Sequence, residues 1–329
     1  MSTSNEIVDY LNRATTVIVL IICIITFIPG IIGLLLNLVI FSQPIQRREP
    51  CSLYFLASSY FNLFVIVINL PIRALASCFD IDISDYHIYL CKTTTFTFYV
   101  TRVISCWLIT FACIDRYFHS SIHIHIRRLS SVKIAKLTIV ITSIVIFLSY
   151  SHMIVYYQIT FGIDMMPACN APKGIYRTFS AFWHLTMYSL CPSFLMFLFG
   201  CLTLRNIHIN HRRIIPIARE NHRMTRRTDC QLLRMLGAQV LMIMISTAPF
   251  SIYRLYASFT SNIVKSTIQI TEENLINQIV NTIPYFAHSS SFYLYTLMGS
   301  RFRRDVIQIF ARCSNFLKEK RMLCTTCCN

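Results

Sequence analysis

Seven long, mostly apolar segments separated by shorter polar ones dominate this chain. They span approximately residues 15–42, 51–77, 91–117, 132–156, 178–204, 231–258 and 275–297. About 20 apolar residues suffice for one helical crossing of a bilayer. Lipid offers no partner for an unpaired backbone group, so each segment must be helical. The pattern predicts an all-α membrane protein with a seven-transmembrane helix bundle over residues 15–297.

The composition agrees with a membrane protein. Hydrophobic residues make up 55% of the 329 residues and charged residues only 13%, whereas about a quarter of a soluble domain is charged. The first apolar run is too long for the apolar region of a signal peptide. The net charge of +16 does not indicate nucleic-acid binding, because the basic residues fall between the apolar runs on alternating sides.

The distribution of basic residues predicts the orientation in the membrane. Most of the 30 Lys and Arg residues follow the first, third, fifth and seventh runs, whereas the other side carries slightly more acids than bases. Cytoplasmic loops are the ones enriched in Lys and Arg. The rule predicts an extracellular amino-terminal segment, residues 1–14, and a cytoplasmic tail, residues 313–329.

Beyond the seventh run, residues 298–312 show a second kind of pattern. Phe302, Val306, Ile309 and Phe310 recur at helical spacing while the bases fall mainly elsewhere. This is typical of a short cytoplasmic amphipathic helix in contact with membrane lipids. Cys313 follows it and is a candidate for palmitoylation, the alternative being an ordinary free thiol.

The sequence indicates no metal site, no cofactor and no enzymatic activity. Half of the 14 cysteines lie inside apolar runs, where cysteine behaves as a small apolar residue. Neither a CxxC…CxxC nor an HExxH pattern occurs. No set of nucleophile, base and orienting group can be assembled, and the histidines at 119, 123 and 125 are more typical of a loop.

A charged tripeptide ends the third apolar run. Asp115-Arg116-Tyr117 puts an acid and a base at the mouth of a membrane span, which is costly unless the charges satisfy each other or a partner. Seven helices with Asp-Arg-Tyr at the inner end of the third resemble the rhodopsin-like G-protein-coupled receptors. The resemblance covers about residues 15–312 and includes these further positions: Gly33, Asn37, Cys91, Pro192, Pro249, and Tyr295 with Phe302 seven residues later.

The resemblance implies a mechanism and partners. Cys91 would form a disulfide with Cys169, the one cysteine of the second outer loop. Arg116 would pair with Asp115 and reach Asp229, and Tyr295 would belong to the same switch. The chain would then be a plasma-membrane receptor that transmits the binding of an extracellular ligand to a heterotrimeric G protein.

The sequence also departs from the family pattern. The second-span aspartate is replaced by Asn62, the residue two before Pro249 is Thr247 and not an aromatic, and Ser291 stands where the family has an asparagine. The sodium ion that the family binds with the second-span carboxylate is therefore doubtful. These differences predict a divergent member.

The resemblance makes two classes of ligand unsuitable, monoamines and the retinal of opsins. Phe98 stands where a monoamine receptor needs an acid, and Tyr285 stands where an opsin needs its lysine. Arg102 lies inside a span, either to bind an anionic or carbonyl-rich group or to pair internally with Thr101 or Ser289. The predicted pocket comprises Phe98, Arg102, His184, Tyr188, Tyr253, Arg254 and Tyr285.

A short peptide, such as a neuropeptide, is the favoured ligand, and a lipid or another small anionic molecule stays open. A transporter or channel of seven helices is the alternative from another class. It would predict inverted repeats, Gly-rich interrupted spans and several intramembrane acids, and the sequence shows none of them.

Overall fold

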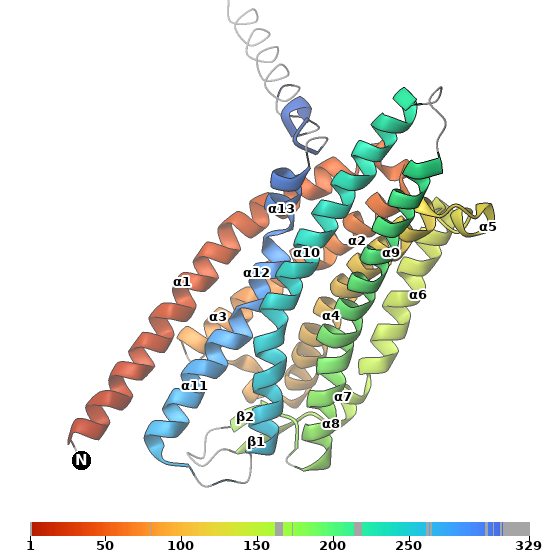
Figure 1. Cartoon of the computed structure of the whole chain (residues 1–329). Coiled ribbons are helices and arrows are strands. Elements are labelled where there is room, and N and C mark those ends of the chain that lie inside the picture. Colours follow the sequence, from red (N-terminus) through yellow and green to blue (C-terminus); the bar gives the residue numbers. More distant parts are fainter. Residues whose placement is uncertain are drawn as a thin grey trace, which may run out of the picture.

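The computed structural model describes residues 2–79, 81–161, 167–172, 174–213, 219–260, 263, 265–299, 302–304, 306–309 and 311. Its helices run roughly parallel as one bundle, with a two-stranded hairpin at one end (Figure 1). The amino terminus lies at the hairpin end, and α5 (Ile124–Arg127) lies at the other end, called the Asp115 end below. Six described helical segments are long and apolar enough to cross a membrane: Asn5–Phe41, Pro50–Cys78, Ile88–Ser120, Val132–Tyr156, Ile175–Ile209 and Arg234–Phe259.

The seventh crossing consists of three consecutive helices. They are α11 (Thr267–Thr282), α12 (Pro284–Ser289) and α13 (Ser291–Met298). All three contact α1 (Ser2–Phe41) and run beside it along the bundle (Figure 1). The fold is therefore a seven-transmembrane helix bundle, as predicted.

The helices extend further than the apolar runs. α1 begins at Ser2, within the segment that was expected to precede the membrane. α9 (Cys191–Arg213) and α10 (Arg219–Phe259) continue well into the basic segment between the fifth and sixth apolar runs. Hydropathy marks where lipid begins, whereas a helix continues for as long as its backbone hydrogen bonds do.

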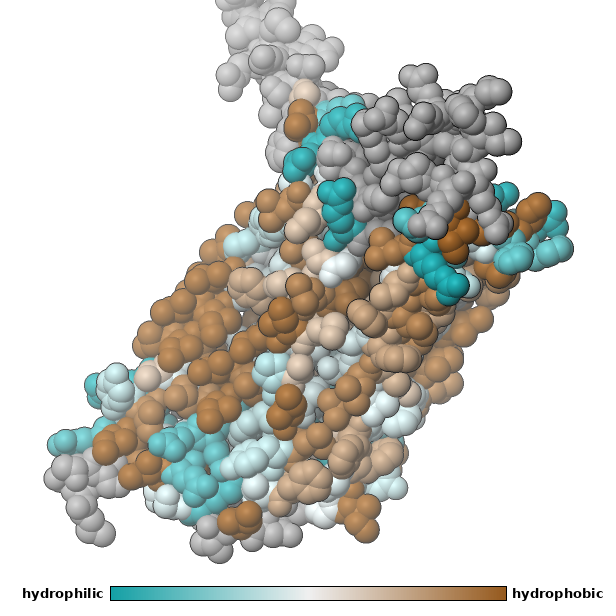
Figure 2. Space-filling view, in the orientation of Figure 1, coloured by the Kyte–Doolittle hydropathy of each residue, from teal (hydrophilic) through white to brown (hydrophobic). Residues whose placement is uncertain are grey.

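The third crossing, α4 (Ile88–Ser120), occupies the centre. It contacts α2 (Pro50–Phe64), α6 (Val132–Tyr150), α9 and α10. Apolar side chains cover the sides of the bundle, and hydrophilic ones gather at its two ends (Figure 2). This surface suits a lipid bilayer around the middle of the helices.

Two crossings contain a π-helical turn, and each turn is followed by a proline. Val65–Asn69 joins α2 to α3 (Leu70–Cys78), and Leu185–Leu190 joins α8 (Ile175–His184) to α9. Proline has no N–H to donate to the carbonyl four residues earlier, which for Pro192 is the carbonyl of Tyr188. That carbonyl accepts from Cys106 Sγ at 3.6 Å, and the neighbouring carbonyl of Met187 accepts from Trp107 Nε1 at 2.8 Å. Side chains of α4 thus stabilise the turn.

The hairpin lies where a loop was expected. β1 (Gln158–Phe161) pairs antiparallel with β2 (Pro167–Asn170), placing Ile159 opposite Cys169. Cys169 forms a disulfide with Cys91 in the first turn of α4, with Cα atoms 5.5 Å apart. The disulfide expected from the family resemblance is thus present.

Asp85, before α4, also contacts the hairpin, and its Oδ1 accepts from the Cys169 N–H at 2.7 Å. Partial burial raises the pKa of the Asp85 carboxyl above its ordinary value, although this hydrogen bond opposes the shift. The start of α4 and the hairpin are therefore joined by a covalent bond and a hydrogen bond.

Close packing between α1 and the seventh crossing depends on a glycine. A Cβ atom placed on Gly30 would lie 2.9 Å from Ser289 Cβ, whereas one on Gly200 would meet nothing within 4 Å. We expect Gly30→Ala to lower stability by about 1–3 kcal/mol through overpacking. Gly200→Ala, its matched control in α9, should be neutral or stabilising by up to about 1 kcal/mol. Thermal unfolding of the purified protein compares the two, and equal melting temperatures would contradict the close approach.

Candidate functional site

The Asp115-Arg116-Tyr117 motif lies in the last two turns of α4. Arg116 Nη2 is 3.0 Å from Asp115 Oδ2, and both side chains are buried, with 4% and 5% exposure. Ser130, in the link between α5 and α6, donates to the other carboxylate oxygen at 2.8 Å. The Tyr117 ring packs against Phe199 of α9. The charges are therefore satisfied locally, as burial requires.

The other two predicted switch residues are Asp229 and Tyr295, which lie on α10 and α13. Asp229 belongs to α10, but its side chain lies outside the described residues, so its predicted contact with Arg116 stays a prediction. Tyr295 of α13 is buried and packs against Phe41, Phe55 and Phe302. Residues 302–304 and 306–309 are helical, and the buried Phe302 fixes this short helix to the bundle. Cys313 lies outside the described residues.

A chain of hydrogen bonds crosses the middle of the bundle through His288. Its Nδ1 lies 2.8 Å from Asn62 Oδ1, and its Nε2 lies 3.1 Å from the Tyr188 hydroxyl. Asn62 Oδ1 also accepts from Ser105 Oγ. Because an amide oxygen only accepts, His288 Nδ1 must carry the proton, and Nε2 then accepts from Tyr188. Four crossings are joined by neutral groups at this point, and we call these four residues the His288 chain.

Asn62 stands at the position where the family has its sodium-binding carboxylate. It carries no charge, and its oxygen already accepts two hydrogen bonds, from His288 and Ser105. A hard cation needs oxygen ligands with negative charge or free lone pairs. The residues present therefore do not suit a sodium ion here.

The predicted pocket residues fall into connected groups. His184 stacks on Tyr188, with ring centroids 4.9 Å apart, and meets Tyr99 edge-on at 4.6 Å. Its Nδ1 lies 3.1 Å from the Tyr150 hydroxyl. Arg254 of α10 lies over the Tyr99 ring, 5.8 Å from its centroid, and donates to the Tyr157 hydroxyl at 3.5 Å. Tyr99 thus links the His184 group to Arg254.

Arg102 belongs to a different group with Tyr285 and Phe98. Its guanidinium lies 4.2 Å from the Tyr285 ring centroid and 5.9 Å from that of Phe98. The internal partners considered from the sequence bond elsewhere, since Thr101 donates to the carbonyl of Thr97 and Ser289 to that of Phe286. Neither of them pairs with Arg102.

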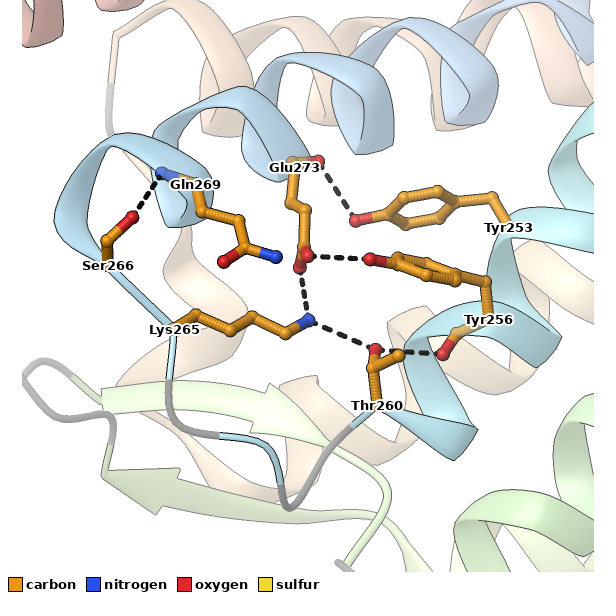
Figure 3. A network of polar contacts seen from close by, with 7 residues as sticks. All are labelled: Tyr253, Tyr256, Thr260, Lys265, Ser266, Gln269 and Glu273. Carbon is orange, nitrogen blue, oxygen red and sulfur yellow. Dashed lines mark hydrogen bonds and ion pairs between the residues drawn. The ribbon is translucent and has the colours of Figure 1, made fainter.

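Tyr253 is directed toward the seventh crossing (Figure 3). Its hydroxyl donates to the backbone carbonyl of Glu273 at 2.9 Å. The Glu273 carboxylate accepts from Tyr256 at 2.9 Å and from Lys265 at 2.5 Å, and Lys265 also donates to Thr260 at 3.0 Å. These contacts join the hairpin ends of α10 and α11, so Tyr253 serves that junction and not the centre of the pocket.

Three buried or half-buried polar residues of the site were not predicted from the sequence: Arg73, Asn69 and His288. Arg73, inside the second apolar run, is half-buried and donates to Gln278 Oε1. Asn69 donates to Thr101 at 3.1 Å, and His288 centres the hydrogen-bond chain. The available signal was a polar residue inside an apolar run, which in a membrane protein marks a functional or structural contact.

Comparison with known proteins agrees with this geometry. The sequence profile of the 7 transmembrane receptor (rhodopsin family) matches residues 33–293. The chain belongs to this family of rhodopsin-like G-protein-coupled receptors, which are multi-pass proteins of the plasma membrane. A search of curated proteins found no match. The membership favours a signalling receptor over a transporter, a channel or an enzyme.

Proposed function

We propose that this receptor binds a short extracellular peptide at the hairpin end and activates a heterotrimeric G protein at the Asp115 end. The observation that carries the proposal is the buried Arg116–Asp115 pair. A buried charge pair is often no more stabilising than apolar residues in its place, so its presence favours a second use, such as exchange of the pair for a partner's groups. The excess of basic residues beside it supports a cytoplasmic location.

The proposed mechanism couples the two ends through α10. In the resting state Arg116 is held by Asp115, and we propose that Asp229 of α10 adds a second contact. Ligand binding favours a state in which the Asp115 end of α10 moves outward and frees Arg116 for the G protein. Two hydrogen bonds hold α10 to its neighbours in this structure: Gln239 Nε2 donates to the carbonyl of Ala287 at 3.2 Å, and Ser189 bonds to Thr247.

A peptide suits the polar groups at the hairpin end. Acids gather in two outer segments, with Asp82 and Asp85 in one and Glu272 and Glu273 in the other. Arg102 and Arg254 lie deeper between the helices. A peptide carries groups of both charges and many backbone donors and acceptors, so one molecule could meet both regions.

Ligand-independent signalling tests this function without knowledge of the ligand. Asp115→Asn frees Arg116 from its charged partner and should raise basal G-protein activation in cells roughly fivefold or more, as expected for allosteric couplings. Arg116→Ala should abolish signalling, and Asp229→Ala should raise it.

Asp9→Asn, an equivalent change at an exposed acid of α1, serves as the control and should leave the basal signal unchanged. Surface expression of each variant is measured in parallel. A basal signal that is the same in the wild type, Asp115→Asn and Arg116→Ala at equal expression would overturn the proposed coupling.

A further inference from the structure

Arg102 is a buried cation without a counter-charge. Its side chain is 7% exposed, and its Nε is buried without a hydrogen-bond partner. The rings of Tyr285 and Phe98 are its contacts, and such contacts contribute about 0.5–2 kcal/mol. An unpaired buried charge costs several kcal/mol. The rings therefore leave most of that cost uncompensated.

Arg73 lies next to this group on α3. Asn69, one helical turn before Arg73, donates to Thr101, the neighbour of Arg102. The Tyr285 hydroxyl donates to the carbonyl of Asn69 at 3.4 Å. The charge of Arg73 is close enough to interact with that of Arg102 and also with that of Asp82. Asn69 thus links Tyr285 and the neighbour of Arg102 to the helical turn that carries Arg73.

Neither arginine is neutralised within the part of the chain that the structure describes. Arg73 donates to the uncharged Gln278, which also accepts from Ser77 at 2.9 Å, and its Nε is buried without a partner. The two ion pairs among the described residues are elsewhere: Arg116 with Asp115, and Lys265 with Glu273. Among the described residues, no carboxylate forms an ion pair with either arginine.

A third polar atom of the site is also unsatisfied. Asn69 Oδ1 is buried and has no hydrogen-bond partner, although the amide nitrogen of the same side chain donates to Thr101. A buried acceptor without a donor costs about 1–3 kcal/mol. The group that fills this site should therefore present an anion to the arginines and an N–H to Asn69.

We infer that the ligand has a free carboxylate that binds Arg102 and Arg73, and that this carboxylate is the carboxyl terminus of a peptide. This inference rests on the proposed function and specifies its ligand. Arginine binds a carboxylate through two parallel N–H···O bonds. The last peptide N–H lies next to the terminal carboxylate and matches Asn69 Oδ1. A peptide ending in an amide has no charge to offer either arginine.

Thermal unfolding of the purified receptor in detergent tests the inference with simple probes. N-acetylphenylalanine, with a free carboxylate, should raise the melting temperature at millimolar concentration, because a ligand of the folded state stabilises it. N-acetylphenylalaninamide should not raise it. Benzoate, which has the carboxylate but no N–H, should raise it less. Equal shifts from acid and amide, or no shift from the acid, would overturn the inference.

Substitution of Arg102 gives two results of opposite sign. Arg102→Gln should weaken binding of the acid roughly tenfold or more, since a charged hydrogen-bonding partner is lost. The same variant without ligand should melt at a higher temperature than the wild type, because an unpaired buried charge has been removed. A lower melting temperature of ligand-free Arg102→Gln would instead mean that Arg102 stabilises the fold through its contacts with the Tyr285 and Phe98 rings, and the inference would fail.

Two controls separate the parts of the argument. Arg13→Gln removes an exposed arginine of α1 and should leave the acid-dependent shift intact. Asn69→Ala should reduce the difference between N-acetylphenylalanine and benzoate. If benzoate stabilises the wild type as much as N-acetylphenylalanine does, the assignment to a peptide terminus is wrong. No G protein is present, so the failure of this binding test is distinguishable from failure of the signalling test.

Discussion

Replacing His288 by alanine should destabilise the receptor by roughly 3–5 kcal/mol, the usual cost of removing a large buried ring. The ring is 5% exposed and hydrogen-bonded on both sides. Its loss leaves a cavity between four crossings and deprives the Tyr188 hydroxyl of its acceptor. The measurement is thermal unfolding of the purified protein, with ligand binding as a second readout.

His208→Ala is the matched control, because His208 is an exposed histidine of α9 and its loss should change little. A second variant, Tyr188→Phe, removes one hydroxyl of the His288 chain and almost no volume. Its effect should shrink in the His288→Ala background, because the two groups share one bond. Strictly additive effects of the two substitutions would show that the bond contributes nothing.

The second large effect is expected at the disulfide between Cys91 and Cys169. The bond joins residues 78 positions apart, and loss of a native disulfide typically costs about 2–5 kcal/mol. Cys91→Ser and Cys169→Ser should each lower the melting temperature and the amount of receptor at the cell surface. Their effects should be nearly equal, because either one breaks the same bond.

The double variant Cys91→Ser, Cys169→Ser provides the decisive comparison. It should be no less stable than the single variants, and a reducing agent should make the wild type resemble it. Cys201→Ser is the control for losing a cysteine, since Cys201 is a free, exposed thiol of α9. A double variant much less stable than either single one would contradict a shared disulfide.

The sequence alone was enough to predict the architecture, because a lipid bilayer requires each crossing to be a long apolar segment. Apolar length alone marks a crossing, and the disulfide followed from two cysteines matched to a family position. The hairpin was not predicted, because residues 158–170 form a short segment whose pairing depends on the disulfide and on Asp85 rather than on strand propensity alone. Local patterns carry little information about such contacts.

The candidate site was predictable in its residue types and not in its pairings. Arg102 stood out as a base in an apolar run, and the structure adds that neither Thr101 nor Ser289 pairs with it. His288 and Asn69 were missed because their role depends on which face of a helix meets which neighbour. The π-helical turn before Pro71 contains Asn69 and rotates its face, so a regular period of 3.6 residues assigns it wrongly.

The seventh crossing has a consequence for how the receptor is made. It consists of three short helices, and it carries Asn277, Asn281 and His288 between lipid-compatible neighbours. Two of its polar groups bond to earlier parts of the chain, His288 to Asn62 and Ser291 to Asn37, whereas Asn281 bonds to Asn277 within the crossing. A nascent chain can therefore insert its first six helices on their own apolar character, whereas the last crossing must dock against a bundle that is already assembled. If an early helix is misplaced, the last crossing lacks the partners for its polar groups. We expect such a receptor to keep these groups exposed and to be retained by cellular quality control.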